Sequence, residues 1–247
     1  MKHNTLKTKE LENNPFINLA IDTISIKKQA IIFVNTKSSA EKTAEEIAER
    51  IKFSGKSDAE IKEGDLLASE VLKALPNPTK QCERLAKCVR KGVAFHHAGL
   101  VYRQRELIED SFREGKIKII CSTPTLAYGV DLPAFRVIIK DLKRYTMHGM
   151  DWIPVLEYQQ FCGRAGRPKY DNCGEAIAIA KTQNDVEKIR DQYIYGESES
   201  IYSKLAVEPV MRTYILSLVA SGFVYTKKQL IDFFKKTFWA HQYKDMV

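Results

Sequence analysis

The sequence predicts an α/β domain with a mainly parallel sheet, followed by a short helical segment. Short apolar runs alternate with helical patterns between about residues 15 and 195, and the strand signal stops after Gly196. Runs that are rich in β-branched residues and too short for a helix are typical of strands covered on both faces. Their alternation with helices is the βαβ rhythm of a parallel sheet. The 247 residues suffice for one large domain or two modest ones.

The apolar runs predict five strands, at residues 29–35, 92–96, 116–121, 135–140 and 175–180. Periodic apolar positions predict helices at 16–24, 40–53, 65–74, 80–91, 101–114, 154–163, 202–220 and 226–238. Ser38 or Ser39 can cap the second of these helices, and Ser221-Gly222 is a good helix end between the last two. Residues 54–64 are polar, and we expect the next helical pattern to begin only at about 65.

Composition narrows the class of protein without fixing a function. The 44% hydrophobic and 28% charged residues exclude a disordered or collagen-like chain. No apolar stretch is long enough for a membrane span and no signal peptide stands at the start, so we expect a soluble, intracellular protein without a membrane partner. The net charge of +8 permits a nucleic-acid partner. The five cysteines form no C-x-x-C pair, which predicts buried thiols rather than a metal site or disulfides.

One phosphate-binding motif is only apparent. Ser54-Gly-Lys-Ser57 has the end of a P-loop, but Arg50 stands where the pattern needs its first glycine. The sequence also contains no Asp-Glu dipeptide, which the acidic metal-holding box of nucleic-acid motors would supply. We therefore expect a surface turn at this place, and the chain alone should not form a standard ATP site.

The densest functional signal is the segment Gln160-Phe-Cys-Gly-Arg-Ala-Gly-Arg-Pro168, which follows a predicted helix. Glycine lets the backbone approach a ligand closely, and guanidinium groups suit bidentate phosphate recognition. Two such arginines fit the arginine-finger role on a transferring γ-phosphate. The alternative is a helix-ending turn with solvated arginines.

A second segment, Ser122-Thr-Pro-Thr-Leu-Ala-Tyr-Gly-Val-Asp-Leu-Pro-Ala134, lies directly after the third predicted strand. Hydroxyl and backbone N–H groups of such a loop can hold phosphates. These two segments resemble motifs V and VI of superfamily-two helicases, and Phe33-Val-Asn-Thr36 resembles their motif IV. Phe95-His-His-Ala-Gly-Leu100, which Arg103 follows, resembles the additional motif of the Ski-like branch. The chain is most similar to the archaeal Ski-like DNA-repair helicases, also called Holliday-junction migration helicases.

The resemblance covers nearly the whole chain. It implies a polar N-terminal segment at 1–14, the second RecA-like motor domain, a three-layer fold, at 15–196, and the start of a winged-helix domain at 197–247. The first motor domain, with its P-loop and acidic box, has no counterpart here, so the chain resembles a fragment of a longer helicase.

The resemblance also assigns roles to residues. It implies catalytic contacts to the nucleotide, with the two arginines on the γ-phosphate, from Gln160, Arg164 and Arg167. Other residues of the ATP cleft would be Gly129, Asp131 and Gly163. Contacts to the backbone of a single strand are implied for Asn35, Thr36, His97, Gly99, Arg103, Thr123 and Thr125. A hairpin between the last two motifs would separate strands through Tyr145, Met147, His148, Met150 and Trp152, around a turn at 148–149.

The function implied is that of the C-terminal motor half of an ATP-dependent 3′-5′ DNA helicase, acting on single-stranded, forked or branched DNA in repair and recombination. ATP and Mg²⁺ would be held mainly by the upstream RecA-like domain, which is the expected protein partner, and none tightly by this chain. The isolated chain should therefore be inactive. The implied location is cytoplasmic and nucleoid-associated, in an archaeon. Alternatives are a stand-alone nucleic-acid-binding or protein-docking module, which keeps the fold without motor activity, and an RNA helicase.

Overall fold

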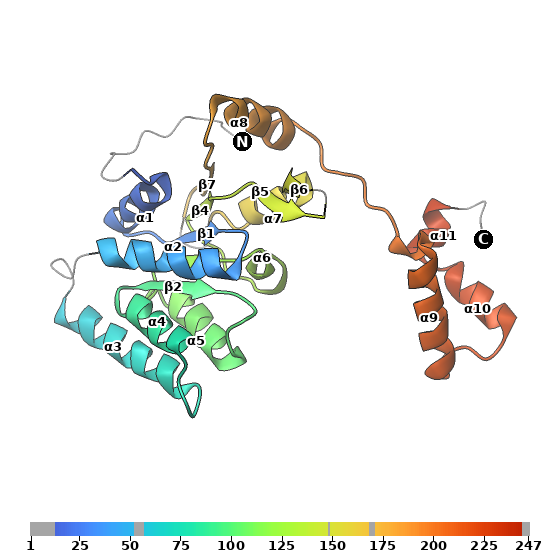
Figure 1. Cartoon of the computed structure of the whole chain (residues 1–247), viewed down its shortest axis with the longest axis horizontal. Coiled ribbons are helices and arrows are strands. Elements are labelled where there is room, and N and C mark those ends of the chain that lie inside the picture. Colours follow the sequence, from blue (N-terminus) through green and yellow to red (C-terminus); the bar gives the residue numbers. More distant parts are fainter. Residues whose placement is uncertain (1–12, 52–56, 148, 168–170, 244–247) are drawn as a thin grey trace. The chain divides into compact units, whose positions relative to one another are not determined.

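The computed structural model describes residues 13–51, 57–147, 149–167 and 171–243. Its contacts divide the chain into two units, Met1–Ser198 and Glu199–Val247. The first unit is an α/β domain around a five-stranded sheet, and the second is helical (Figure 1). The predicted fold class, a RecA-like α/β domain followed by a helical segment, is confirmed.

The five predicted strands form one sheet in the order β2-β3-β1-β4-β7, and every neighbouring pair is parallel. Every residue of the first four strands is buried, as the continuous apolar runs predicted, whereas β7 at the edge is half-buried. The strands are β1 (Ala30–Phe33), β2 (Val93–His96), β3 (Ile119–Ser122), β4 (Arg136–Ile139) and β7 (Glu175–Ala178).

Helices cover both faces of the sheet, because right-handed crossovers bring the connections between strands to one face or the other. On one face, the α1 side, Arg136 of β4 donates hydrogen bonds to Leu19 and Thr23 of α1. On the other, Phe33 of β1 stacks on Phe161 of α7, with ring centroids 4.2 Å apart. The helices of this unit are α1 (Pro15–Ser25), α2 (Lys37–Arg50), α3 (Asp58–Lys73), α4 (Lys80–Arg90), α5 (Tyr102–Arg113), α6 (Thr125–Gly129), α7 (Val155–Cys162) and α8 (Gln183–Lys188), which the π-helix η2 (Ile189–Ile194) continues.

Two helices begin earlier than predicted because of their caps. The helix expected from about 65 begins at Asp58, where Ser57 and Glu60 form a reciprocal capping box. The helix expected from 40 begins at Lys37, and its cap is Thr36, whose side chain accepts from the backbone N–H of Ser39. The apparent P-loop ends on the cap Ser57, and its residues 54–56 lie outside the described part of the chain.

A separate antiparallel hairpin follows β4. Its strands are β5 (Lys143–Thr146) and β6 (Gly149–Trp152), so the predicted pair of short strands is confirmed. Of the predicted turn, His148 lies outside the described residues. Gly149 adopts φ 110°, which favours glycine.

The second unit is helical, as predicted, but its helices are shorter than expected. Pro209 lies in the first turn of α9 (Glu208–Ala220), after the 3₁₀ turn η3 (Lys204–Ala206). The helix expected at 226–238 ends at residue 234, as α10 (Lys227–Phe234), and Thr237 caps a further helix, α11 (Phe238–Gln242), which was not expected. No residue of α9 is buried, although the helix is largely apolar.

The structure separates the cysteines into two groups. Cys82, Cys88 and Cys121 are buried, as expected, and Cys162 is half-buried. Cys173 is exposed, so the prediction of five buried thiols is wrong at this residue, which lies just before the edge strand. Among the described residues, no helix combines the length and the apolar character that crossing a bilayer requires.

Candidate functional site

Several predicted site residues lie just beyond the carboxyl ends of the strands. Asn35 and Thr36 follow β1 closely, His97 follows β2, and Thr123 follows β3. Because all five strands are parallel, their carboxyl ends meet at this edge, where open α/β sheets bind ligands.

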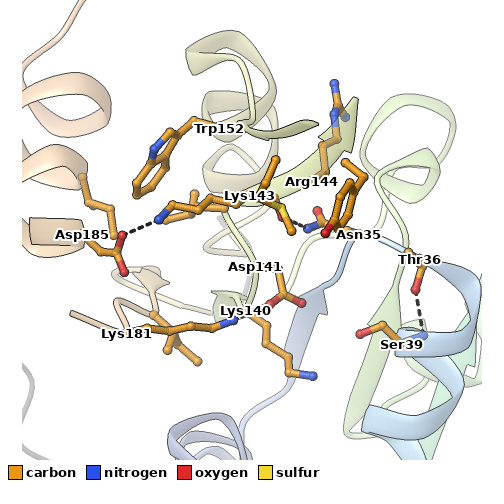
Figure 2. Close-up of a pocket in the computed structure, with 15 residues that line it drawn as sticks. Asn35, Thr36, Ser39, Lys140, Asp141, Lys143, Arg144, Trp152, Lys181 and Asp185 are labelled. Atoms are coloured by element: carbon orange, nitrogen blue, oxygen red, sulfur yellow. Dashed lines mark hydrogen bonds and ion pairs between the residues drawn. The ribbon is translucent and has the colours of Figure 1, made fainter. Parts of the chain in front are cut away.

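A cavity of about 460 Å³ opens at this edge, between the end of β1, the base of the hairpin and the start of α8 (Figure 2). Figure 2 shows Lys143 extending from β5 to Asp185, 2.8 Å away, beside the ring of Trp152. Six charged side chains line the cavity, four of them cationic and two of them carboxylates: Lys140, Lys143, Arg144, Lys181, Asp141 and Asp185. Three of the four cations are paired with carboxylates, Lys143 with Asp185, Lys181 with Asp141 and Arg144 with Glu157, so an anionic ligand here would compete with these ion pairs.

The two predicted strand-contact residues of this cavity bind within the protein. The Asn35 amide donates to the backbone carbonyl of Lys143, so it fastens the hairpin to the end of β1. The Thr36 hydroxyl caps α2. Each side chain therefore has a structural role that the sequence did not reveal.

The His97 turn is buried rather than exposed. The His97 ring accepts from the backbone N–H of Gly99 and donates to Glu41, both over 3.1 Å, and no part of its side chain reaches solvent. Burial lowers the pKa of His97 below its usual value, which keeps the ring neutral. The His97 side chain is therefore engaged within the protein, the backbone of this turn remains for contact with a strand, and that contact stays a prediction.

A second cavity, of about 580 Å³, lies between α5 and the loop after β3. Thr125 and Asp131, two predicted site residues, line it together with His96 and Arg105. Thr123 lies beside it, with its hydroxyl 3.0 Å from that of Thr125. In contrast, Arg103 is exposed on α5 and pairs with Glu106 over 2.6 Å.

Arg164 lies just beyond the end of α7, beside α6. Its guanidinium donates to the backbone carbonyl of Ala127 and lies 3.6 Å from Asp131, whose side chain is 96% exposed. The backbone carbonyl of Arg164 accepts from Ala134 N–H, which fixes the loop against the strand entry. The structure thus brings Arg164 and Asp131 together, close to Gly129 at the end of α6.

Arg167 lies three residues further along the same loop, at the amino end of β1, which is the strand next to β4. It pairs with Asp171 over 2.7 Å and donates to Gln29, the residue before β1. Lys28 also pairs with Asp171, over 2.6 Å. The hydrogen bond from Arg167, then that from Lys28, hold the pKa of the Asp171 carboxyl below its usual value. The two predicted arginines therefore have different surroundings, and Arg167 is held by an ion-pair cluster.

The other two predicted site residues of this segment are exposed. Gln160 is exposed on the last turn of α7, and the exposed Gly163 ends the helix. Gly166 adopts φ 94° and donates to Ala134, which gives the arginine loop its sharp turn. Gln160, Gly163 and Arg164 thus lie within one helical turn.

The hairpin presents apolar side chains at its tip. Tyr145 is 81% exposed, Met147 fully and Met150 53%. Trp152 differs, because it lies at the base of the hairpin, with the Lys143 ammonium 4.5 Å from its ring and Tyr193 packed beside it. The structure therefore places Trp152 away from the exposed tip, and its part in strand separation stays a prediction.

Sequence reasoning missed the residues that hold these parts in place, namely Asp185, Glu157 and Arg136, and the lysines of the cavity. The run Lys140-Asp-Leu-Lys-Arg144 is the one signal that indicated a basic surface near the hairpin. In the described part of the chain, no cluster of three or more acidic, histidine or cysteine side chains is arranged to hold a metal ion.

Comparison with known proteins shows which proteins the chain resembles. Residues 77–169 match the family described as helicase conserved C-terminal domain. The chain is similar to the ATP-dependent DNA helicase Hel308 of Methanococcus vannielii, with 41% identity over 96% of this chain and 31% of the relative. The Hel308 proteins of Pyrococcus abyssi and Pyrococcus horikoshii are 46% and 43% identical over 94% of this chain and 32% of each relative. The chain therefore spans about a third of the length of these relatives.

Proposed function

The chain is a Hel308-like helicase region that carries a helicase conserved C-terminal domain, and from this premise we propose that it is the C-terminal motor half of an ATP-dependent 3′-5′ DNA helicase. Its substrates would be single-stranded, forked or branched DNA. The observation that carries the proposal is the placement of Arg164. Its guanidinium lies at a helix end, held by one carbonyl and by a long ion pair to an almost fully exposed aspartate.

Such an arginine suits a nucleotide bound by another domain. A guanidinium that can leave a weak internal partner can move onto the γ-phosphate, where it stabilises the charge of the transition state. ATP and Mg²⁺ would be held mainly by a preceding motor domain, with Gln160 and Gly163 beside the nucleotide. Mg²⁺ would neutralise phosphate charge there.

The carboxyl edge of the sheet would hold the DNA strand. Three lysines line the cavity there besides Arg144, which is paired with Glu157, and basic side chains bind phosphates without reading the base sequence. The hairpin rises from the same cavity, since Tyr145 and Met150 also line it. The exposed tip of Tyr145 and Met147 would meet the last base pair of a duplex, and apolar side chains can unstack such a pair.

A strand-separation assay tests this proposal. We define the joined protein as this chain placed after a first motor domain that contains a P-loop. In it, the double variant Tyr145→Ser/Met147→Ser should unwind a forked DNA duplex about tenfold more slowly, which corresponds to about 1.4 kcal/mol of barrier. Its ATP turnover on single-stranded DNA should stay unchanged, because the tip lies away from Arg164.

The matched control is Leu66→Ser, which removes an exposed apolar side chain from α3, outside both cavities. It should leave unwinding unchanged. If the unaltered joined protein binds DNA without unwinding it, the chain is a binding module instead. If it unwinds an RNA fork and not a DNA fork, the chain belongs to an RNA motor, a distinction that depends on the 2′-hydroxyl.

A further inference from the structure

The hairpin is fastened at its base by side chains from three other elements. Asn35, just after β1, donates its amide to the carbonyl of Lys143, and the Lys143 ammonium pairs with Asp185 of α8 over 2.8 Å. The neighbouring Arg144 reaches α7, where its Nη1 donates to both carboxylate oxygens of Glu157, over 2.9 and 2.8 Å. The base of the hairpin is thus bound on several sides while its tip is exposed.

The pair of Arg144 and Glu157 combines two hydrogen bonds with a buried carboxylate. The Glu157 side chain is 8% exposed and lies in the first turn of α7, where a carboxylate also favours the helix dipole. The Arg144 side chain is 40% exposed. Because a buried carboxylate needs its partner, α7 holds the guanidinium, and with it strand β5, in one position.

The same helix leads to the arginine loop. α7 runs from Val155, shortly after the hairpin, to Cys162, and Arg164 follows one residue beyond its cap Gly163. Phe161 of α7 stacks on Phe33 in the central strand, which fixes the helix on the sheet. Helix α7 therefore links Arg164, the predicted nucleotide contact, to the hairpin. The ion pair of Arg144 and Glu157 joins α7 to strand β5 of the hairpin.

We propose that Arg144 and Glu157 are positioning residues that hold the hairpin rigidly on α7, so that movement of this domain during ATP turnover reaches the hairpin tip. The inference rests on the proposed helicase function and adds to it a pair that touches neither nucleotide nor DNA. Without the pair, the domain would still move on ATP turnover, but the hairpin would shift relative to α7 and would not separate the strands.

The test is Glu157→Gln in the joined protein. This variant keeps the shape of the side chain and leaves the half-exposed Arg144 in contact with water, so the fold should survive. We expect unwinding of a forked duplex to slow about tenfold or more, since small misplacements of a working group have effects of this size. ATP turnover on single-stranded DNA and the melting temperature should stay unchanged.

Charge reversal provides the rescue. The double variant Arg144→Glu/Glu157→Arg restores an ion pair between the same two positions, and it should unwind faster than Glu157→Gln. Arg144→Lys keeps the positive charge beside Glu157, but its side chain is one bond shorter than that of Arg144, whose terminal Nη1 makes both contacts. It should therefore hold β5 less firmly and slow unwinding without loss of stability. This variant keeps the proposal testable if Glu157→Gln fails to fold.

The matched control is Asp65→Asn, which removes an ion pair of 3.1 Å with Arg90 between α3 and α4, far in the sequence from the hairpin. It should leave unwinding unchanged. The proposal is overturned if Glu157→Gln and Arg144→Lys unwind normally, or if ATP turnover falls in parallel with unwinding. If the unaltered joined protein does not unwind DNA, both the proposed function and the positioning role are wrong. If it unwinds DNA and both variants unwind it equally well, only the positioning role is wrong.

Discussion

Arg164→Ala is expected to lower the DNA-stimulated ATP turnover of the joined protein by about 10³-fold or more, the range known for arginine fingers. The reason is that alanine removes the positive charge nearest to the transferring phosphate in the proposed complex. Among the described residues, its polar contacts are one hydrogen bond to a carbonyl and one long ion pair, so the melting temperature should stay unchanged. Steady-state turnover with saturating single-stranded DNA measures the effect.

Arg167→Ala should differ in kind. We expect it to lower turnover as well, and also to lower the free energy of unfolding by about 1–3 kcal/mol, because Asp171 loses a hydrogen-bonded cation. Lys28 remains paired with that carboxylate, which limits the loss. Arg90→Ala, on the exposed surface of α4, is the control and should change neither quantity. Turnover that is indifferent to both Arg164→Ala and Arg167→Ala would favour a binding module without motor activity.

Arg136→Met should lower the free energy of unfolding by about 3–5 kcal/mol, the cost of breaking a buried ion pair. The Arg136 side chain is 2% exposed and pairs with Asp22 over 2.8 Å and with Glu175 over 2.7 Å. It also donates to the Leu19 carbonyl and the Thr23 hydroxyl, which would lose their donor in the interior. The residue therefore joins α1, β4 and β7 beside the arginine loop.

Urea unfolding of the chain measures this loss. In a Trp239→Phe background the fluorescence of Trp152 reports the first unit alone, since the sequence holds two tryptophans. Arg90→Met serves as the control for an exposed arginine and should stay within about 0.5 kcal/mol of the parent. A loss below about 1 kcal/mol for Arg136→Met would show that the buried ion pairs are not needed for the fold.

The sheet could be predicted from the sequence because burial on both faces leaves a continuous apolar run. The runs at 29–35 and 116–121, for example, became adjacent central strands, and the hairpin between β4 and α7 was also predicted. The ends of the helices depend on local caps. The capping box of Ser57 and Glu60 lies within a polar stretch, where apolar periodicity does not indicate a helix start. Apolar periodicity therefore predicted the elements better than their ends.

The candidate site was predictable as a set of segments but not as a set of contacts. Periodicity shows which side of an element is buried, whereas the partners of a polar side chain depend on the tertiary fold. Nothing in the sequence indicated that His97 bonds Glu41 in the interior, that Arg167 bonds Asp171, or that Arg136 is buried within an apolar run. The same limit applies to Trp152, because alternation along a strand decides the face of a side chain but not which partner, such as Lys143, its ring contacts.

The most direct test of the half-motor account is ATP turnover, measured with and without single-stranded DNA, for this chain alone and for the joined protein. The account predicts no turnover above background for the chain alone and DNA-stimulated turnover for the joined protein, because the arginines act on a nucleotide that another domain holds. Robust turnover by the purified chain alone would contradict it, since that result requires a complete nucleotide site within these 247 residues.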